Sequence, residues 1–324
     1  MSLTGKKTVP NRRLRAAAVA ATLLGALALS ACGDGGGSES SALEQTTVSG
    51  GSDSAAPKIE VKPKPLKVTE TETRVLDEGD GDKVASGQIV SLRYVLVNGK
   101  DGAQLDTNYG KANLGLNLGD ANLLPGLKKG LTDQKVGSRV LVAMPPKDAF
   151  GTQGNPTLKV GGEDTVVFLL DVLSATTPLK SAEGKAVTPP KDLPSVKMAE
   201  GKAATITIPK GEKPPTSTVG QLLVEGKGAE VKSGQTIRVS YTGALWKDGK
   251  VFDSSANSPQ GYFETVIGQK QVITAWDKEL VGKKVGSRVL LVVPPKDGYG
   301  AAGSPPKISG TDTLVFVVDI LAAY

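Results

Sequence analysis

The chain of 324 residues contains no histidine, and this absence narrows the chemistry open to it. Without an imidazole there is no Ser-His-Asp or Cys-His catalysis, and no metal site built on histidine ligands. Aromatic residues are also scarce, at 4% of the chain. We therefore expect that the protein binds no metal and no cofactor. An enzyme built on this chain must work without histidine as its general base.

Cysteine occurs once, at position 32, so the chain cannot form an internal disulfide and must be stabilised by packed cores. Before it, the apolar run 16–29 follows five basic residues, Lys6, Lys7, Arg12, Arg13 and Arg15. This pattern is typical of a secretory signal and is too short for a stable membrane anchor. Residues 29–32, Leu-Ser-Ala-Cys, resemble the bacterial lipobox, in which the cysteine is acylated and becomes the mature N-terminus.

We therefore predict a lipoprotein signal peptide over residues 1–31 and a lipid such as palmitate on Cys32, which anchors the protein at the extracytoplasmic face of the cell membrane. The alternative is an ordinary signal sequence that happens to end beside a cysteine. The net charge of +6 includes the five basic residues of the leader, which has no acidic residue, so the rest of the chain carries +1. This balance leaves no basic patch of the kind that binds nucleic acid.

Two long segments of the chain nearly repeat each other: KVGSRVLVAMPPKDAFG at 135–151 and KVGSRVLLVVPPKDGYG at 284–300. Shorter pairs recur in the same order at an offset of about 148 residues, which is typical of a duplicated domain and not of a solenoid repeat. We predict domains over 66–175 and 196–324. The Gly-, Ser- and Pro-rich residues 32–65 are predicted to form a flexible tether, and the Pro-rich residues 176–195 a linker.

Each copy has the same order of expected elements. An alternating strand and a glycine-containing turn come first, followed by one short helix, on which Val272, Ile273, Trp276 and Leu280 share a face in the second copy. A strand over 287–293, a Gly- and Pro-rich loop over 294–310 and a final strand over 313–321 complete the second copy. Mostly antiparallel strands with one helix on one face predict the α+β class.

The second copy resembles the FKBP-type peptidyl-prolyl cis-trans isomerases. The resemblance rests on five blocks in the family's order, from about residue 218 to the C-terminus: Tyr241-Thr242-Gly243, Val251–Ser255, Val272-Ile273-x-x-Trp276, Tyr299-Gly300 and Thr313–Phe316. It implies two antiparallel half-barrels, each wrapped around one short helix, and an apolar cleft between helix and sheet that takes up a prolyl residue. It also implies proline-containing unfolded or exported polypeptides as substrates and makes macrolide immunosuppressants candidate ligands.

The resemblance implies a pocket with Trp276 as its floor. Its aromatic walls are four residues, Tyr241, Phe252, Phe263 and Phe316. Val272 and Ile273 line it, and the backbone N–H of Ile273 donates to the bound peptide. Asp253 and Tyr299 are its polar members, and Ile308 caps its mouth. The family's loop histidine is replaced by Ser304, and another apolar loop position by Lys307. Taken one at a time, aromatic residues on strands are more typical of a core. Their occurrence together, in the order found in the family, is what favours a pocket.

These residue types suit rotation about an X-Pro bond, which has a barrier of about 20 kcal/mol because the amide must lose its resonance. No covalent bond breaks, so no nucleophile is needed. The twisted transition state has less charge separation than the planar amide, and a dry aromatic pocket can favour it by differential binding. We expect the Tyr299 hydroxyl to donate to a substrate carbonyl, while Asp253 either faces the carbonyl before proline or orders Tyr241.

The first copy keeps Tyr94, Asp106 and Phe168 but loses much of the implied pocket. Leu105 stands at the position of Phe252, and Leu114 at that of Phe263. Leu127 stands at the position of Trp276, and Phe150 at that of Tyr299. Aliphatic replacements preserve a core but remove the flat floor. We expect domain one to fold like domain two and to isomerise poorly or not at all.

The main hypothesis is a lipid-anchored isomerase that assists the folding of exported proteins, with its active site in domain two. The alternatives are a non-catalytic chaperone or scaffold that binds proline-containing segments, and a surface lipoprotein whose domains are only structural.

Overall fold

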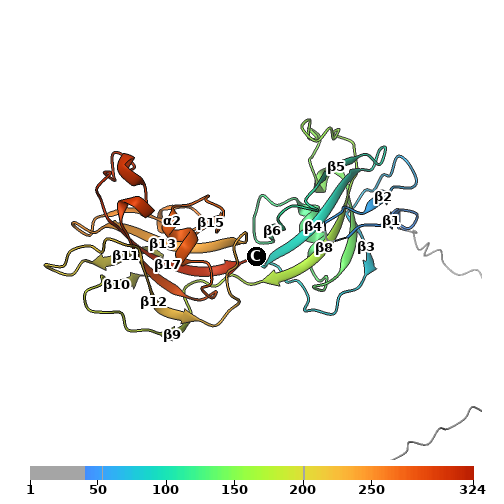
Figure 1. Ribbon diagram of the computed structural model, residues 1–324. Coiled ribbons are helices and arrows are strands. Elements are labelled where there is room, and N and C mark those ends of the chain that lie inside the picture. Colours follow the sequence, from blue (N-terminus) through green and yellow to red (C-terminus); the bar gives the residue numbers. More distant parts are fainter. Residues whose placement is uncertain (1–40, 53, 200) are drawn as a thin grey trace, which may run out of the picture. The chain divides into compact units, whose positions relative to one another are not determined.

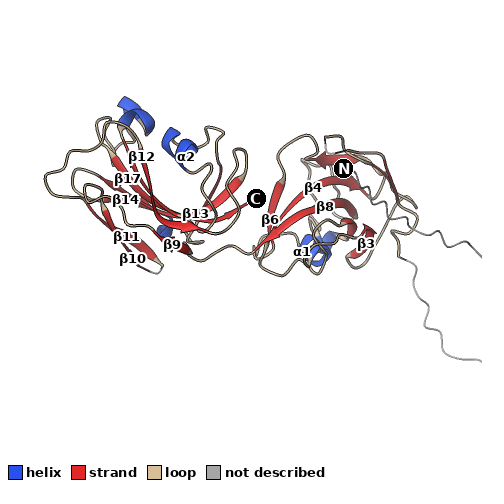
Figure 2. Ribbon diagram, turned by 60° about the horizontal axis from the view of Figure 1, so that its bottom comes forward, coloured by secondary structure: helices blue, strands red, loops and turns tan. Residues whose placement is uncertain are grey.

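The computed structural model describes residues 41–52, 54–199 and 201–324. The predicted signal peptide and Cys32 lie outside these residues. Within them, each sequence repeat forms an antiparallel sheet with one short α-helix against it (Figures 1 and 2), which confirms the predicted α+β class. None of the helices found in these residues is long and apolar enough to cross a membrane.

Domain one contains a six-stranded sheet of order β3-β7-β8-β4-β5, in which β6 also pairs with β4. Its strands are β3 (Glu72–Asp77), β4 (Ile89–Asn98), β5 (Gln104–Thr107), β6 (Leu114–Asn117), β7 (Arg139–Met144) and β8 (Val166–Thr176). The helix α1 (Pro125–Leu131) begins with proline. The first helical turn accepts a proline because the N–H groups of that turn have no acceptor within the helix, so the N–H that proline lacks is not missed. The 3-10 turn η1 (Pro146–Asp148) follows β7.

Domain two repeats this arrangement with a seven-stranded sheet of order β14-β13-β17-β16-β12-β9, in which β15 also pairs with β13. Its strands are β9 (Gly184–Ala186), β12 (Val219–Gly226), β13 (Thr236–Leu245), β14 (Val251–Ser254), β15 (Phe263–Val266), β16 (Arg288–Val293) and β17 (Leu314–Ala323). The helix is α2 (Thr274–Glu279), and the 3-10 turns are η2 (Ser255–Asn257), η3 (Pro295–Asp297) and η4 (Gly300–Ala302). The predicted last two strands are therefore present, within two residues of their expected ends.

Both sheets are buried on two faces, because the central strands β8 and β17 each begin with five consecutive buried apolar residues, 166–170 and 314–318. In β17, Phe316 and Val318 point into the core beneath α2, whereas Val315 and Val317 belong to a second cluster. Successive side chains of a strand face opposite sides of the sheet, so a continuous apolar strand needs cover on both. In domain two the second face is covered by the hairpin of β10 (Ser195–Ala199) and β11 (Lys202–Thr207).

In domain one the second face is covered by residues 41–68, which we call the N-terminal arm. The arm contains the hairpin of β1 (Thr47–Ser49) and β2 (Lys58–Glu60) and buries Leu43 and Val61 completely. These side chains pack with Val167 and Leu169 of β8. The prediction of a flexible tether is therefore wrong for residues 41–65, because the outer face of β8 needs an apolar cover.

Polar contacts fix the arm in place. One guanidinium nitrogen of Arg74 donates to the carbonyls of Leu43, Glu44 and Thr46, and the carboxylate of Glu72 accepts from Ser41 and the N–H of Ala42. Both anchoring side chains lie on β3.

The predicted linker is also partly structural. Residues 184–186 form β9, which pairs with β12, and the N–H of Ala182 donates to Asp319 at 2.9 Å. Leu193 is buried with the second apolar cluster of domain two. The N–H of Leu179 also donates to the carbonyl of Leu321 at 3.0 Å. The linker prediction for 176–195 is therefore wrong from residue 179 onward, because this segment completes the edge and outer face of the second sheet.

Candidate active site

A cleft of about 1050 Å³ opens in domain two beside α2. Nine of the ten side chains predicted to form a prolyl pocket line it: Tyr241, Phe252, Asp253, Phe263, Val272, Ile273, Trp276, Tyr299 and Phe316. They come from β13, β14, β15, α2, β17 and the loops before α2 and after β16. Antiparallel pairing of these strands therefore brings together residues up to 75 positions apart in the chain.

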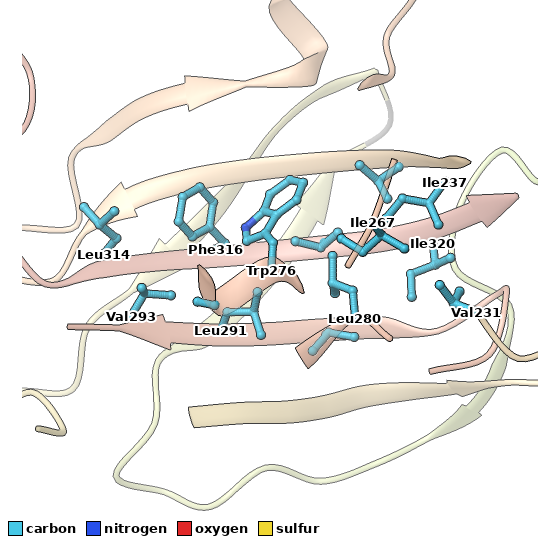
Figure 3. Close-up of a cluster of buried hydrophobic side chains, with 14 of the residues drawn as sticks. Val231, Ile237, Ile267, Trp276, Leu280, Leu291, Val293, Leu314, Phe316 and Ile320 are labelled. Atoms are coloured by element: carbon cyan, nitrogen blue, oxygen red, sulfur yellow. The ribbon is translucent and has the colours of Figure 1, made fainter. Parts of the chain in front are cut away.

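Trp276 lies at the centre of a cluster of rings. Its indole is 4% exposed and meets Tyr241, Phe263 and Phe316 edge to face, with ring centroids 5.3, 6.3 and 5.6 Å away. Figure 3 shows the indole beside the ring of Phe316. Phe252 continues the cluster through an edge-to-face contact of 5.5 Å with Phe316. Such contacts hold each ring in one orientation and give the cleft a rigid apolar surface.

Gly243 is a further residue of this cluster that was not predicted from the sequence. A Cβ atom at position 243 would lie 2.6 Å from Phe252 and 2.9 Å from Phe316, which is too close for any other residue. Gly243 pairs with Phe316 across β13 and β17 and with Asp253 across β14. Its lack of a side chain lets both rings approach the sheet. The signal was present in the sequence as a glycine within a strand, which often marks such a close approach.

Asp253 and Tyr241 form a hydrogen-bonded pair at the wall of the cleft. The Tyr241 hydroxyl donates to the Asp253 carboxylate at 2.5 Å, and the N–H of Ser254 donates to the other carboxylate oxygen at 2.8 Å. Of the two roles considered for Asp253, the structure contains the contact that orders Tyr241. Burial and then this hydrogen bond raise the pKa of Tyr241, so the phenol stays protonated at neutral pH.

Tyr299 lies between η3 and η4 and is 42% exposed at the edge of the cleft. Partial burial and then the nearby charge of Asp253 raise the pKa of Tyr299, so its hydroxyl is a donor at neutral pH. Val272 and Ile273 precede α2 instead of lying within it, and Ile273 is its N-cap. The N–H of Ile273 has no acceptor in the described part of the chain and is available to a ligand.

Ile308 is the predicted site residue that the structure places elsewhere. It is 5% exposed in the apolar core and is not part of the cleft lining. The reason is the fold of the loop, since Ser304 and Ile308 exchange backbone hydrogen bonds of 2.9 and 3.0 Å and turn Ile308 inward. Lys307, beside it, donates from Nζ to the carbonyl of Phe252 at 2.9 Å and ties the loop to β14.

Domain one keeps the polar pair but not the ring cluster. The Tyr94 hydroxyl donates to Asp106, and the Tyr94 and Phe168 rings are 5.9 Å apart. Leu127, at the position of Trp276, is 6% exposed in an otherwise mostly aliphatic core. In the described residues of either domain, no group of three or more Cys, Asp or Glu side chains is placed to hold a metal ion.

Comparison with known proteins gives a consistent family. Residues 81–173 and 227–321 match the family model of the FKBP-type peptidyl-prolyl cis-trans isomerases. A probable FK506-binding protein of Corynebacterium glutamicum is 36% identical over 118 residues, which cover 36% of this chain and 96% of that protein. The 39 kDa FK506-binding nuclear protein of Drosophila melanogaster is 39% identical over 119 residues, 36% of this chain and 33% of that protein.

The chain spans about a third of the Drosophila protein's length. Among solved structures, the crystal structure of the three FKBP domains of wheat FKBP73 matches with a TM-score of 0.34 and 21% identity. That match covers 78% of this chain and 94% of the wheat chain. Since the two segments that match the family model make up more than half of the chain, the protein belongs to the FKBP-type peptidyl-prolyl cis-trans isomerases and carries two copies of the family's domain in tandem.

Proposed function

We propose that the protein catalyses cis-trans isomerisation of X-Pro bonds in exported polypeptides, and that domain two is its active domain. The observation that carries this proposal is the open cleft whose floor and walls are Trp276, Tyr241, Phe263 and Phe316, held edge to face. A prolyl ring is apolar and fits against such rings, while the rest of the peptide remains in solvent.

The chemistry requires only that the cleft binds the twisted amide better than the planar one. Apolar walls favour the twisted form, because it has less charge separation. The N–H of Ile273 holds the peptide backbone, and the Tyr299 hydroxyl donates to a substrate carbonyl. Asp253 holds the Tyr241 ring in place through its hydroxyl. The raised pKa values of Tyr241 and Tyr299 keep both phenols protonated at neutral pH, so we expect little dependence of kcat on pH between about 6 and 8.

Domain one is proposed to be weak or inactive as an isomerase. Leu127 and Phe150 stand where domain two has Trp276 and Tyr299, so the flat floor and the donor hydroxyl are both missing. The intact Tyr94–Asp106 pair supports the second candidate function for this domain, the non-catalytic holding of proline-containing segments.

The proposed location is the extracytoplasmic face of the membrane, through a lipid on Cys32. Cys32 lies nine residues before Ser41, the first residue of the packed arm. An extended chain spans at most about 3.5 Å per residue, so the lipid would hold domain one within about 30 Å of the bilayer. Labelling with radioactive palmitate tests the anchor, and Cys32→Ala should abolish both the label and recovery in the membrane fraction.

A protease-coupled assay with a proline-containing tetrapeptide tests the activity. We expect the whole chain and a segment of residues 177–324 to be active, and residues 41–176 to be at least tenfold slower, about 1.4 kcal/mol in the barrier. A macrolide of the FK506 type should compete for the cleft. Equal activity of both segments would contradict the assignment to domain two. Inactivity of both, with peptide binding retained, would favour the chaperone.

A further inference from the structure

We propose that the cleft of domain two selects proline-containing segments that carry an acidic side chain next to the proline. The inference rests on the proposed function and adds a charge preference to it. It comes from the charged residues that line the cleft, which are Asp253, Asp277, Lys270 and Lys278. The two carboxylates accept hydrogen bonds within the protein, whereas one lysine has no ion-pair partner among the described residues and the other has only a long one.

The two acidic residues are occupied by internal donors. Asp253 accepts from the Tyr241 hydroxyl and from the N–H of Ser254. Asp277 accepts from the N–H groups of Gly268 and Lys270 at 2.6 and 2.7 Å and thereby fastens the loop that leads into α2. A carboxylate with two donors already in place has less capacity to accept from a ligand. Asp253 remains exposed, but its carboxylate and that of Asp277 are each tied to donors within the protein.

Lys270 is the first of the two lysines in the cleft lining. Its side chain is exposed, and no carboxylate of the described residues lies within ion-pair distance of its Nζ. Its backbone has φ of 59°, in the left-handed region that disfavours a lysine, and Asp277 holds its N–H there. A glycine or asparagine would adopt this conformation at lower cost, so the lysine carries a local strain.

Lys278 is only loosely paired. Its Nζ lies 3.8 Å from Asp297, and its side chain is 65% exposed. Asp297 also accepts from Thr218 at 2.9 Å, so the carboxylate has another partner if the lysine turns to a ligand. Lys278 is therefore a second cation that can move into the cleft at small cost.

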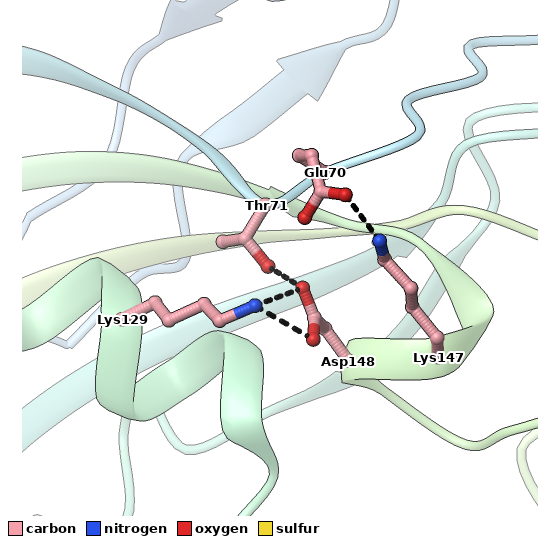
Figure 4. A network of polar contacts seen from close by, with 5 residues as sticks. All are labelled: Glu70, Thr71, Lys129, Lys147 and Asp148. Atoms are coloured by element: carbon pink, nitrogen blue, oxygen red, sulfur yellow. Dashed lines mark hydrogen bonds and ion pairs between the residues drawn. The ribbon is translucent and has the colours of Figure 1, made fainter.

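Domain one shows how differently the same position can be used. Lys129, the counterpart of Lys278, contacts both carboxylate oxygens of Asp148 at 2.8 and 2.9 Å, and Thr71 donates to the same carboxylate (Figure 4). Ala121 stands at the position of Lys270. Domain one thus ties up one lysine and lacks the other, whereas domain two leaves both facing its cleft.

The expected preference follows from Coulomb attraction at a partly exposed site. Exposed ion pairs contribute modestly and are screened by salt over about 8–10 Å. We expect kcat/KM for a peptide with glutamate beside proline to exceed that of its glutamine analogue about threefold and its lysine analogue about tenfold at low salt. Most of this difference should disappear in 0.5 M NaCl, where the Debye length is about 4 Å.

The test uses the full chain and NMR exchange spectroscopy, which follows isomerisation without a coupling protease. Two peptide series place glutamate, glutamine or lysine directly before or directly after proline. A salt-sensitive preference for glutamate in either series supports the inference. Equal or slower turnover of the glutamate peptide in both series overturns it. Turnover of the glutamine peptides without any charge preference leaves the isomerase function intact and refutes only this inference, whereas no turnover of any peptide refutes both.

Variants locate the effect. Lys270→Asn removes the charge with a residue that tolerates positive φ, and Lys278→Gln removes the second charge; each should lower the glutamate-to-glutamine ratio toward one. Lys270→Arg keeps the positive charge and should preserve the preference for glutamate. Lys296→Gln changes the net charge equally at an exposed residue outside the cleft lining and should leave the ratio unchanged. A ratio that falls equally in Lys296→Gln would show a general charge effect and contradict the assigned site.

Discussion

The two domains have the same sheet order around their central strands and the same Tyr–Asp pair, yet they close the space between helix and sheet with different side chains. Domain two places Trp276 among three other rings, whereas domain one places Leu127 among aliphatic residues. The frame therefore does not depend on the rings. Because a duplicated frame tolerates both fillings, packing alone does not require the aromatic cluster, and the cluster supports the function that we propose for domain two.

The domains also differ in how they cover the outer face of the sheet. Domain one uses the arm, which precedes the rest of the domain, and domain two uses the hairpin β10–β11 and residues around Leu193. Both covers come from segments just before the repeated sequence. The shared sheet therefore needs a cover, but the sequence of that cover is free to differ.

The largest expected effect is on the stability of domain one. A chain that begins at residue 69 lacks Leu43, Val61 and Leu66, each of which contributes about 1.5–3 kcal/mol when fully buried. Since a domain is stable by about 5–15 kcal/mol, we expect domain one to unfold or aggregate. Both tryptophans lie in domain two, so calorimetry and limited proteolysis should follow domain one, with tryptophan fluorescence as the control for domain two. A chain that begins at residue 41 should keep the transition.

The next prediction tests whether the aromatic floor of the cleft accounts for the expected difference in isomerase activity between the two domains. Trp276→Leu gives domain two the residue found in domain one, and we expect kcat/KM to fall about tenfold or more because the rigid ring surface is lost. The stability cost should be about 2 kcal/mol, and Trp246 still reports the fold by fluorescence. Leu127→Ala in domain one is the matched control and should leave turnover unchanged. Unchanged turnover in Trp276→Leu would remove the basis for assigning activity to domain two.

A smaller effect is expected at the edge of the cleft. Tyr299→Phe gives domain two the residue of Phe150 and removes one donor hydroxyl. A neutral hydrogen bond contributes about 1 kcal/mol, so kcat should fall about fivefold while the fold is kept. The reciprocal Phe150→Tyr should not create activity in domain one, since the aromatic floor is still absent there. Activity gained from Phe150→Tyr alone would show that the hydroxyl matters more than the floor.

The smallest effect concerns acid stability at a matched pair of positions. Hydrogen bonds from Lys247 and Ser309 lower the pKa of Asp312, and those from Asn98 and Gly161 lower the pKa of Asp164. A lowered folded-state pKa adds stability that is present above about pH 4 and is lost as the pH falls through the folded-state value. The melting temperature should therefore fall by a few degrees in acid, and less so in Asp312→Asn for domain two and Asp164→Asn for domain one. An equal acid shift in variant and parent would exclude these carboxylates as the cause.

The residues of the cleft could be inferred from the sequence because their order matches a family, and nine of the ten lie where a ligand can reach them. Ile308 could not be placed in this way, since backbone hydrogen bonds of its own loop turn it inward. The arm was also mistaken for a tether, because its composition resembles a linker. A signal against a tether was present elsewhere in the sequence, in the five apolar residues 166–170 that begin β8 and require cover on both faces.

The sequence by itself determined the duplication, the class of each domain, the family and the identity of the aromatic residues in the second copy, because all of these are encoded in local order and spacing. Only the tertiary structure decided which segments cover the outer faces, why Gly243 admits two rings, and which charges at the cleft remain free. Those properties depend on contacts between residues distant in the chain, and whether a lysine meets a carboxylate at 2.8 Å or 3.8 Å cannot be read from its position in the sequence.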